Sequence, residues 1–477
     1  VPGIWMAPVS SDVQKPKDWY QLSRRDYQFD STQKKDFSPM EVLNPIGNYL
    51  DCTHPGVEEF ICSSIGTMHD MGFRYFKFDY NYIGKHRPYN PKMTNFQVMR
   101  HLFELYRKSL GEESFILACG APMRPVVGLA DASRMSWDAL ARWKSYPLAD
   151  DGLPTLCTDI FDGIYNTAMS SGLNMGLYIN DPDVTYLLPR AEDHIWQGPE
   201  GSFDLEKHGL KWSGLKTFHS YVGLMGGMTM ISEPLYKPEY QQKNSIRMFE
   251  ILYPPAPEKA WSMNGDIDPW GKQFGFVAEK PWGTSASVVL WNKEDVPADL
   301  SLDTYTLKTL GEKFHIWSFW DEKYLGISDG TFVAEDVEAN GCMLLKLTRV
   351  TNPPKIPVIV GSNLHISMGS AELDAIIIND EETVIKLTNA GARNGRIYLY
   401  SPKPLKVQKS YGCNAFILPQ ADNISIVVIT DRSVNEPNTI HLSVEKSVAY
   451  HDELLKNAEQ KEKFLKSGFD TDQMQVR

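Results

Sequence analysis

The chain has 477 residues, of which 42% are hydrophobic and 23% charged, the composition of an ordinary globular protein with room for about two to four domains. A formal net charge of −12 disfavours nucleic acids and anionic membranes as partners, because both recruit basic patches. No apolar run approaches the length of a membrane span, and the six cysteines show no metal-site or disulfide-scaffold spacing, so neither a metal nor a cofactor is expected and the compartment stays open.

Strand-like and helix-like runs alternate from residue 1 to about residue 255, as in βα units around a parallel sheet. This stretch predicts a partial (β/α) barrel domain over residues 1–255. Its six candidate strands are Ile4 to Val9, Tyr75 to Asp79, Phe115 to Cys119, Ser133 to Trp137, Met175 to Asn180 and Met228 to Ile231.

Two helices between these strands have clear boundaries. The first opens at a capping Thr53, carries Pro55 in its first turn and stops at Gly72. The second opens with the capping box Thr94 to Gln97 and ends at Gly111. We expect both helices to be structural.

The pattern changes at the proline-rich segment around residue 255. Short alternating segments separated by turn residues predict an antiparallel β-sandwich over 256–350 and, after Asn352-Pro353-Pro354, a second β domain over 351–435. Residues 436–477 form a charged extension with a helix expected over 447–467, either packed on a neighbour or frayed. The predicted fold class is thus α/β: a (β/α)8-type TIM barrel with about six units present, followed by antiparallel β-sandwich domains.

Two carboxylates end strand-like runs in the barrel region. Asp79 follows a short apolar and aromatic stretch, and Asp138 ends the run that starts at Asp131. Each alone is explained by a helix cap or an ion pair. Together they are the minimal equipment of a glycosidase, in which one carboxylate acts at the anomeric carbon and the other protonates the leaving oxygen.

The order and content of the barrel segments resemble the retaining α-galactosidases of glycoside hydrolase families 36 and 27. The motifs that carry the resemblance are Pro2-Gly3-Ile4-Trp5-Met6-Ala7-Pro8, Leu50-Asp51-Cys52-Thr53-His54-Pro55, Lys77-Phe78-Asp79-Tyr80-Asn81, Cys119-Gly120, Arg134-Met135-Ser136-Trp137-Asp138, Asn180-Asp181-Pro182-Asp183 and Gly226-Gly227-Met228-Thr229-Met230-Ile231-Ser232-Glu233. Glu233 stands where the families usually have Asp.

The resemblance implies double displacement with Asp79 as nucleophile and Asp138 as acid/base. The implied substrate is a terminal α-galactoside or α-N-acetylgalactosaminide on an oligosaccharide or glycoconjugate. The implied substrate-binding residues are Trp5, Lys77, Asn81, Cys119, Arg134, Trp137, Asp181 and Asp183.

Several alternatives remain open. Lys77 serves equally well as an ion-pair partner, Arg134 as a residue that orients a carboxylate, and Asp181 and Asp183 as helix caps. Two other functions fit the same motifs: galactosyl transfer, as in the raffinose-synthase branch of family 36, and carbohydrate binding by an inactive barrel.

The opening motif resembles the third barrel strand of these families, so the first two strands are expected to be missing from this chain. The open edges at Ile4 to Val9 and Met228 to Ile231 would then be covered by a preceding segment or by a second copy of the chain.

Overall fold

The computed structural model describes residues 1–11, 15–16, 19, 48–81, 88–141, 143, 159–189, 209–264, 270–352, 356–379, 382–444, 456–471 and 474. These residues form two compact units. The first unit comprises the described parts of Val1–Met135 and Leu173–Asp181, and the second comprises those of Ser136–Ser145, Cys157–Gly172 and Pro182–Arg477.

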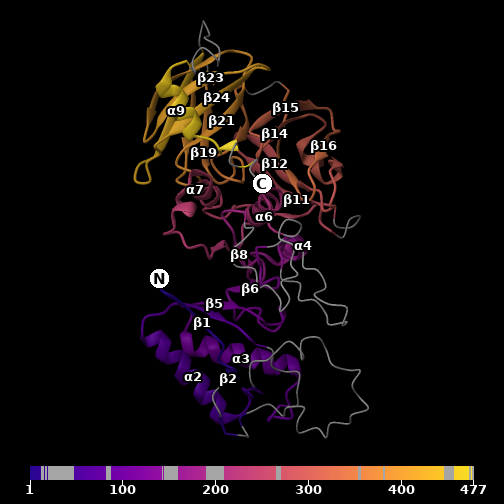
Figure 1. Cartoon of the computed structure of the whole chain (residues 1–477), viewed down its shortest axis with the longest axis vertical. Coiled ribbons are helices and arrows are strands. Elements are labelled where there is room, and N and C mark those ends of the chain that lie inside the picture. The colour runs from indigo at the N-terminus through magenta and orange to yellow at the C-terminus, as the bar shows by residue number, and fades with distance from the viewer. Residues whose placement is uncertain are drawn as a thin grey trace. The chain divides into compact units, whose positions relative to one another are not determined.

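The first unit is built on a five-stranded parallel sheet (Figure 1). Across this sheet the strands follow one another in chain order. The wall of a (β/α) barrel has this order, whereas a doubly wound sheet reverses its order at a switch point. The strands are β1 (Gly3–Met6), β4 (Tyr75–Phe78), β5 (Phe115–Ala118), β6 (Ala132–Arg134) and β7 (Ile179–Asp181), and a small antiparallel pair is formed by β2 (Ser10–Ser11) and β3 (Asn48–Tyr49).

Both predicted helices of this unit are confirmed, as α2 (Pro55–Asp70) and α3 (Asn95–Leu110). The cap of α2 is His54 rather than Thr53, because the His54 ring accepts a hydrogen bond from the backbone N–H of Gly56. The capping box of α3 forms as expected. The buried sides of α2 and α3 share one core cluster with Phe76 and Phe78, so one face of the sheet is covered by helices.

The second unit begins with a further α/β portion. It contains α4 (Ile160–Ser170), β8 (Val184–Thr185), α6 (Trp212–Met225), β9 (Met230–Ile231) and α7 (Lys243–Glu250), with short 3-10 turns at Ser171–Leu173 and Pro238–Gln241. The sixth predicted strand therefore exists as β9, and among the described residues it pairs in parallel with β8.

The first antiparallel domain contains a six-stranded sheet and a small two-stranded sheet, which enclose an apolar core. In spatial order the larger sheet is β10 (Trp261–Ser262), β11 (Gln273–Lys280), β12 (Gly283–Trp291), β17 (Cys342–Arg349), β14 (Phe314–Ser318) and β15 (Lys323–Ser328). The smaller is β13 (Ala298–Ser301) with β16 (Val333–Val337), and a 3-10 turn spans Tyr305–Leu310.

The next domain is a sandwich of two four-stranded antiparallel sheets around a second apolar core. One sheet is β18 (Val358–Ser362), β21 (Gly395–Tyr400), β24 (Ile424–Thr430) and β23 (Asn414–Pro419). The other is β19 (Leu373–Ile378), β20 (Thr383–Leu387), β25 (Asn438–Val444) and β22 (Leu405–Tyr411). Strand β25 lies beyond residue 435, where the sequence placed the end of this domain. The fold class, a parallel α/β region followed by antiparallel β domains, is confirmed.

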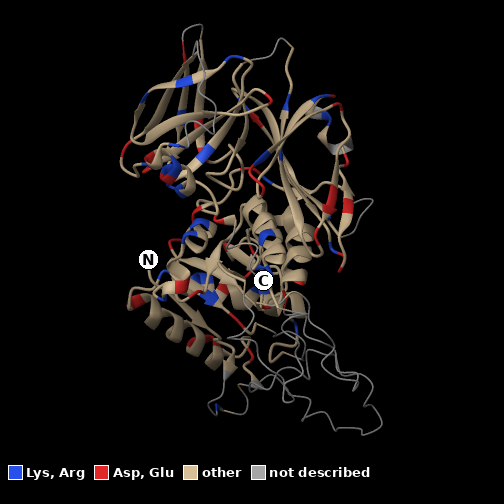
Figure 2. Ribbon diagram, turned by 45° about the horizontal axis from the view of Figure 1, so that its top comes forward, with Lys and Arg blue, Asp and Glu red and all other residues tan. Residues whose placement is uncertain are grey.

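The chain continues into helix α9 (Ala458–Lys466), which is shorter than the helix expected over 447–467; residues 447–455 of that expectation lie outside the described residues. The guanidinium of Arg396 lies 3.7 Å from the ring centroid of Phe464 and donates to Ser467, so the helix packs on the sandwich. Basic and acidic side chains are interspersed over the antiparallel sheets (Figure 2). None of the described helices is long and apolar enough to cross a membrane.

Close strand packing in the second unit gives a stability prediction. Gly275 lies in β11, where an added Cβ would sit 2.0 Å from the backbone oxygen of Ser287 on β12. Gly275→Ala should therefore lower the free energy of unfolding by about 1 to 3 kcal/mol, as overpacking does. Urea unfolding measures the change. Gly172→Ala is the control, because nothing lies within 4 Å of its added Cβ; equal midpoints for the two variants would contradict the prediction.

Candidate active site

Strand register in the first unit gathers polar side chains in one layer. The sheet aligns Lys77 with Leu117, Ala132 and Ile179 on successive strands. Since side chains alternate between faces, residues two positions further along each strand share that face. These residues, at the carboxyl ends of β4, β5, β6 and β7, are Asp79, Cys119, Arg134 and Asp181.

This polar layer is on the face of the sheet opposite α2 and α3. Phe76 and Phe78 point to the helix-covered face, and Lys77 and Asp79 alternate with them. Carboxyl ends of parallel strands are where barrel enzymes carry their catalytic groups. The structure thus brings together five of the predicted site residues: Lys77, Asp79, Cys119, Arg134 and Asp181.

The carboxylate of Asp79 is half-buried and held at both oxygens. Trp5 donates its indole N–H to Oδ2 over 3.1 Å, and the backbone N–H of Tyr80 donates to Oδ1 over 2.7 Å. Tyr80 has a φ of 54°, a left-handed conformation that turns the chain directly after the strand. Trp5, which is 52% exposed, therefore joins the layer from the neighbouring strand β1.

Cys119 is buried beside Asp79 and Arg134. The Arg134 guanidinium lies 3.5 Å from the Cys119 Sγ. Burial raises the pKa of the Cys119 thiol to about 12, helped by the charge of Asp79 and by a hydrogen bond with its carboxylate, and opposed by the cations Arg134 and Lys77. At neutral pH the thiol is therefore protonated and acts as a weak hydrogen-bond donor toward Asp79 rather than as a nucleophile.

Tyr75 is a further member of this face that the motifs did not indicate. Its ring stacks on Phe115 with centroids 5.4 Å apart. Burial raises the pKa of its hydroxyl, and the charge of Asp181 adds to the effect. The alternation Tyr75, Lys77, Asp79 along one strand is the sequence signal that identifies it.

Asn81 was expected to contact the substrate, but it is fully buried. Its Nδ2 donates to the backbone oxygens of Phe78 and Cys119, over 2.9 and 2.8 Å, and its Oδ1 accepts from the Tyr106 hydroxyl over 2.9 Å. The amide therefore joins the ends of β4 and β5 to helix α3. These bonds lie on the helix-covered side and hold the strand ends that carry the polar layer.

Trp137, Asp138 and Asp183 belong to the second unit. Asp138 is exposed and Trp137 is 40% exposed. The buried carboxylate of Asp183 accepts the backbone N–H of Ala139 over 2.7 Å, and the hydroxyl of Tyr186 donates to the Ala139 oxygen over 2.7 Å. The loop that carries Asp138 is thus fixed immediately after that residue.

Glu233, which stands where the resembled families have Asp, lies in the second unit. Glu233 is buried, and its Oε1 accepts the backbone N–H of Leu187 over 3.2 Å, so it links the loop after β9 to the segment after β8. Within the described part of the chain, no group of three or more His, Cys, Asp or Glu side chains is arranged to hold a metal ion.

No protein-family model matches the chain. Among solved structures, a family 27 β-L-arabinopyranosidase from Geobacillus stearothermophilus is 14% identical with a TM-score of 0.46, covering 64% of this chain and 65% of that one. The α-galactosidase I of Mortierella vinacea is 16% identical with a TM-score of 0.43, covering 63% and 72%. An isomalto-dextranase from Arthrobacter globiformis T6 is 12% identical with a TM-score of 0.43, covering 93% and 79%.

These likenesses concern the fold alone. The chain spans 65% of the length of the arabinopyranosidase structure.

The role of Asn81 gives a second prediction. Asn81→Ala would remove one hydrogen bond from each of the Phe78 and Cys119 backbone oxygens and from the Tyr106 hydroxyl, although the Phe78 oxygen keeps the N–H of Cys119. The free energy of unfolding should therefore fall by at least about 2 kcal/mol. Thermal or urea unfolding measures it. Asn95→Ala, at an exposed position of α3, is the control and should change stability by less than about 0.5 kcal/mol. A fully stable Asn81→Ala protein would show that the buried amide does not hold the strand ends.

Proposed function

We propose that the protein is a retaining glycoside hydrolase that releases terminal α-galactosyl or α-N-acetylgalactosaminyl residues. The observation that carries the proposal is the carboxylate of Asp79, which stands at the carboxyl end of a parallel strand with a donor on each oxygen and two cations on the same face of the sheet. The choice of sugar rests on the motif resemblance.

In the first step Asp79 attacks the anomeric carbon and forms a covalent glycosyl-enzyme. Trp5 and the N–H of Tyr80 fix the orientation of the attacking oxygens, which favours a near-attack geometry. Lys77 and Arg134 offer cationic donors to sugar hydroxyls, and the Cys119 thiol borders the same space. Asn81 acts as a support and not as a sugar contact.

In the same step Asp138 protonates the leaving oxygen, and in the second step it activates the attacking water. This role requires its carboxyl group to stand about 5 to 5.5 Å from that of Asp79, a separation that stays a prediction. The anchoring of Ala139 by Asp183 and Tyr186 supplies the fixed loop that a positioned acid needs. Trp137 offers an exposed ring beside it.

Two alternative functions fit the same sequence motifs. A transferase keeps both carboxylates and differs in what accepts the sugar, so product analysis with an added sugar acceptor separates it from a hydrolase. An inactive carbohydrate-binding barrel needs neither carboxylate. The two donors that hold the oxygens of Asp79 fit an oriented nucleophile, and activity measurements on the carboxylate variants separate a hydrolase from this last alternative.

Substitution of the two carboxylates tests the assignment. Asp79→Ala should abolish turnover of all aryl α-galactosides. Asp138→Ala should lower the rate of hydrolysis about 10²- to 10⁴-fold for substrates whose leaving groups need protonation, and much less for substrates with activated leaving groups. Rates are measured with a series of aryl galactosides on protein whose fold is verified by circular dichroism.

Asp70→Ala is the matched control, because this carboxylate lies at the exposed end of α2 with 87% of its side chain accessible, and its rates should stay unchanged. If Asp79→Ala kept full activity, Asp79 would not be the nucleophile. If Asp138→Ala lost the same factor in rate with activated and with poor leaving groups, Asp138 would not be the acid that protonates the leaving oxygen.

A further inference from the structure

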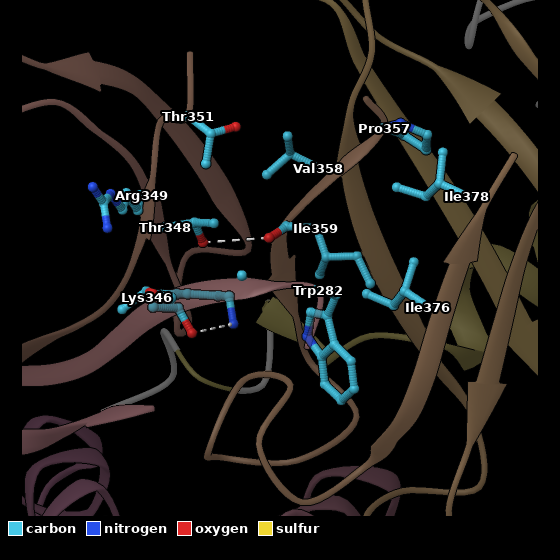
Figure 3. A pocket seen from close by; sticks show the side chains of 13 residues that line it. Trp282, Lys346, Thr348, Arg349, Thr351, Pro357, Val358, Ile359, Ile376 and Ile378 are labelled. Atoms are coloured by element: carbon cyan, nitrogen blue, oxygen red, sulfur yellow. Dashed lines mark hydrogen bonds between the residues drawn. The ribbon is translucent and has the colours of Figure 1, made fainter. Parts of the chain in front are cut away.

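A small cavity lies between the two antiparallel β domains of the second unit (Figure 3). Its walls come from the start of β12 and the end of β17 on one side, and from β18 and β19 on the other. A hydrogen bond of 3.3 Å from the Thr348 hydroxyl to the Ile359 oxygen joins the two domains there. The cavity has a volume of about 40 Å³, which is room for a monatomic ion or a few water molecules and far too little for a sugar.

One wall of the cavity carries a buried lysine. Lys346 is 5% exposed, and its Nζ donates to the backbone oxygen of Met368 and, over 3.5 Å, to the Ser285 hydroxyl. Gly369 permits this approach, because a Cβ at that position would come within 3.1 Å of the Nζ. An ammonium group has three N–H donors, so one remains for an occupant of the cavity.

The ammonium of Lys346 has no carboxylate within ion-pair distance among the described residues. Of the two more distant carboxylates that act on it, that of Glu258 is already paired with Lys280 over 2.7 Å. Burial lowers the pKa of Lys346 to about 8, while Glu372 and Glu258 oppose this shift and Lys280 adds to it. The amine is therefore largely protonated at neutral pH, and such a buried charge is costly unless an anion lies beside it.

Two further donors border the same space. The indole of Trp282, in the turn between β11 and β12, lies beside Ile376 with its ring nitrogen directed toward the Lys346 side (Figure 3). Neither this N–H nor the O–H of Ser285 has an acceptor among the described residues. None of the described lining residues is acidic, and strand alternation turns Arg349 to the opposite face of β17, so the charge in the cavity comes from Lys346.

We propose that this cavity binds a halide ion, which is chloride under ordinary conditions. The ion accepts the remaining N–H of Lys346, the indole N–H of Trp282 and the O–H of Ser285, so that donors without an acceptor and a charge without a counter-ion are satisfied together. A water molecule would accept from the same donors but would leave the charge unmatched. The proposal does not depend on the assignment of glycosidase activity.

Anomalous diffraction from crystals of the full chain soaked in sodium bromide tests the proposal directly. We expect a bromide peak in contact with the Nζ of Lys346 and the indole nitrogen of Trp282. Crystals of Lys346→Met should lack this peak, because the variant removes the charge that holds the ion. Crystals of Lys323→Met, at an exposed position of β15, should keep it. A cavity that holds only water after the bromide soak would overturn the proposal.

A second variant and a measurement in solution cover the case in which Lys346→Met does not fold. Replacing sodium gluconate by sodium chloride at constant ionic strength should raise the unfolding midpoint of the unaltered protein saturably, by at least about 2 °C, because the ion binds only the folded state. Trp282→Phe keeps an aromatic ring and removes one donor, so it should weaken chloride binding about three- to tenfold. The absence of a saturable rise, or the same chloride dependence in Trp282→Phe, would contradict the proposal.

Discussion

A single buried amide joins four parts of the second unit. The Nδ2 of Asn363 donates to Glu322 in the first β domain and to the Ser467 oxygen after α9, over 2.7 and 3.2 Å, while its Oδ1 accepts the backbone N–H of Arg396 over 2.6 Å. Its backbone oxygen accepts from Arg247 of α7 over 2.8 Å. Because a buried polar group is costly unless its bonds are made, these parts are held in one arrangement by the need to satisfy Asn363.

The segment that carries Asn363 extends this constraint. Residues 363–370 are all buried, although they connect β18 to β19 and loops of this kind usually lie on the surface. His365 bonds the Pro254 oxygen, Ser287 bonds the Ser367 oxygen and Lys346 bonds the Met368 oxygen. The cavity beside Lys346 is therefore formed where three parts of the unit meet, and its buried charge follows from the same connection.

In the first unit, the buried side chain of Asn81 likewise joins several segments through hydrogen bonds. Asn81 bonds two strand ends and a helix hydroxyl. On the opposite face of the sheet, strand register brings Asp79, Cys119 and Arg134 together. The face of β4 that carries Phe76 and Phe78 packs with α2 and α3, and the opposite face presents the polar side chains of Lys77 and Asp79. This division follows from the twofold alternation of side chains along a strand.

Local patterns in the sequence determined the existence and order of the six strands, the presence of α2, the ends of α3, the change to antiparallel sheets and the place of Asp79 at a strand end. Caps, turns and alternation act over a few residues and are therefore visible in the sequence. Only the tertiary structure decided that Trp5 donates to a carboxylate 74 positions away, that Asn81 is a buried support, that β9 pairs with β8 and that Lys346 lines a cavity. These features depend on which distant segments meet, and a pattern confined to neighbours along the chain does not contain that information.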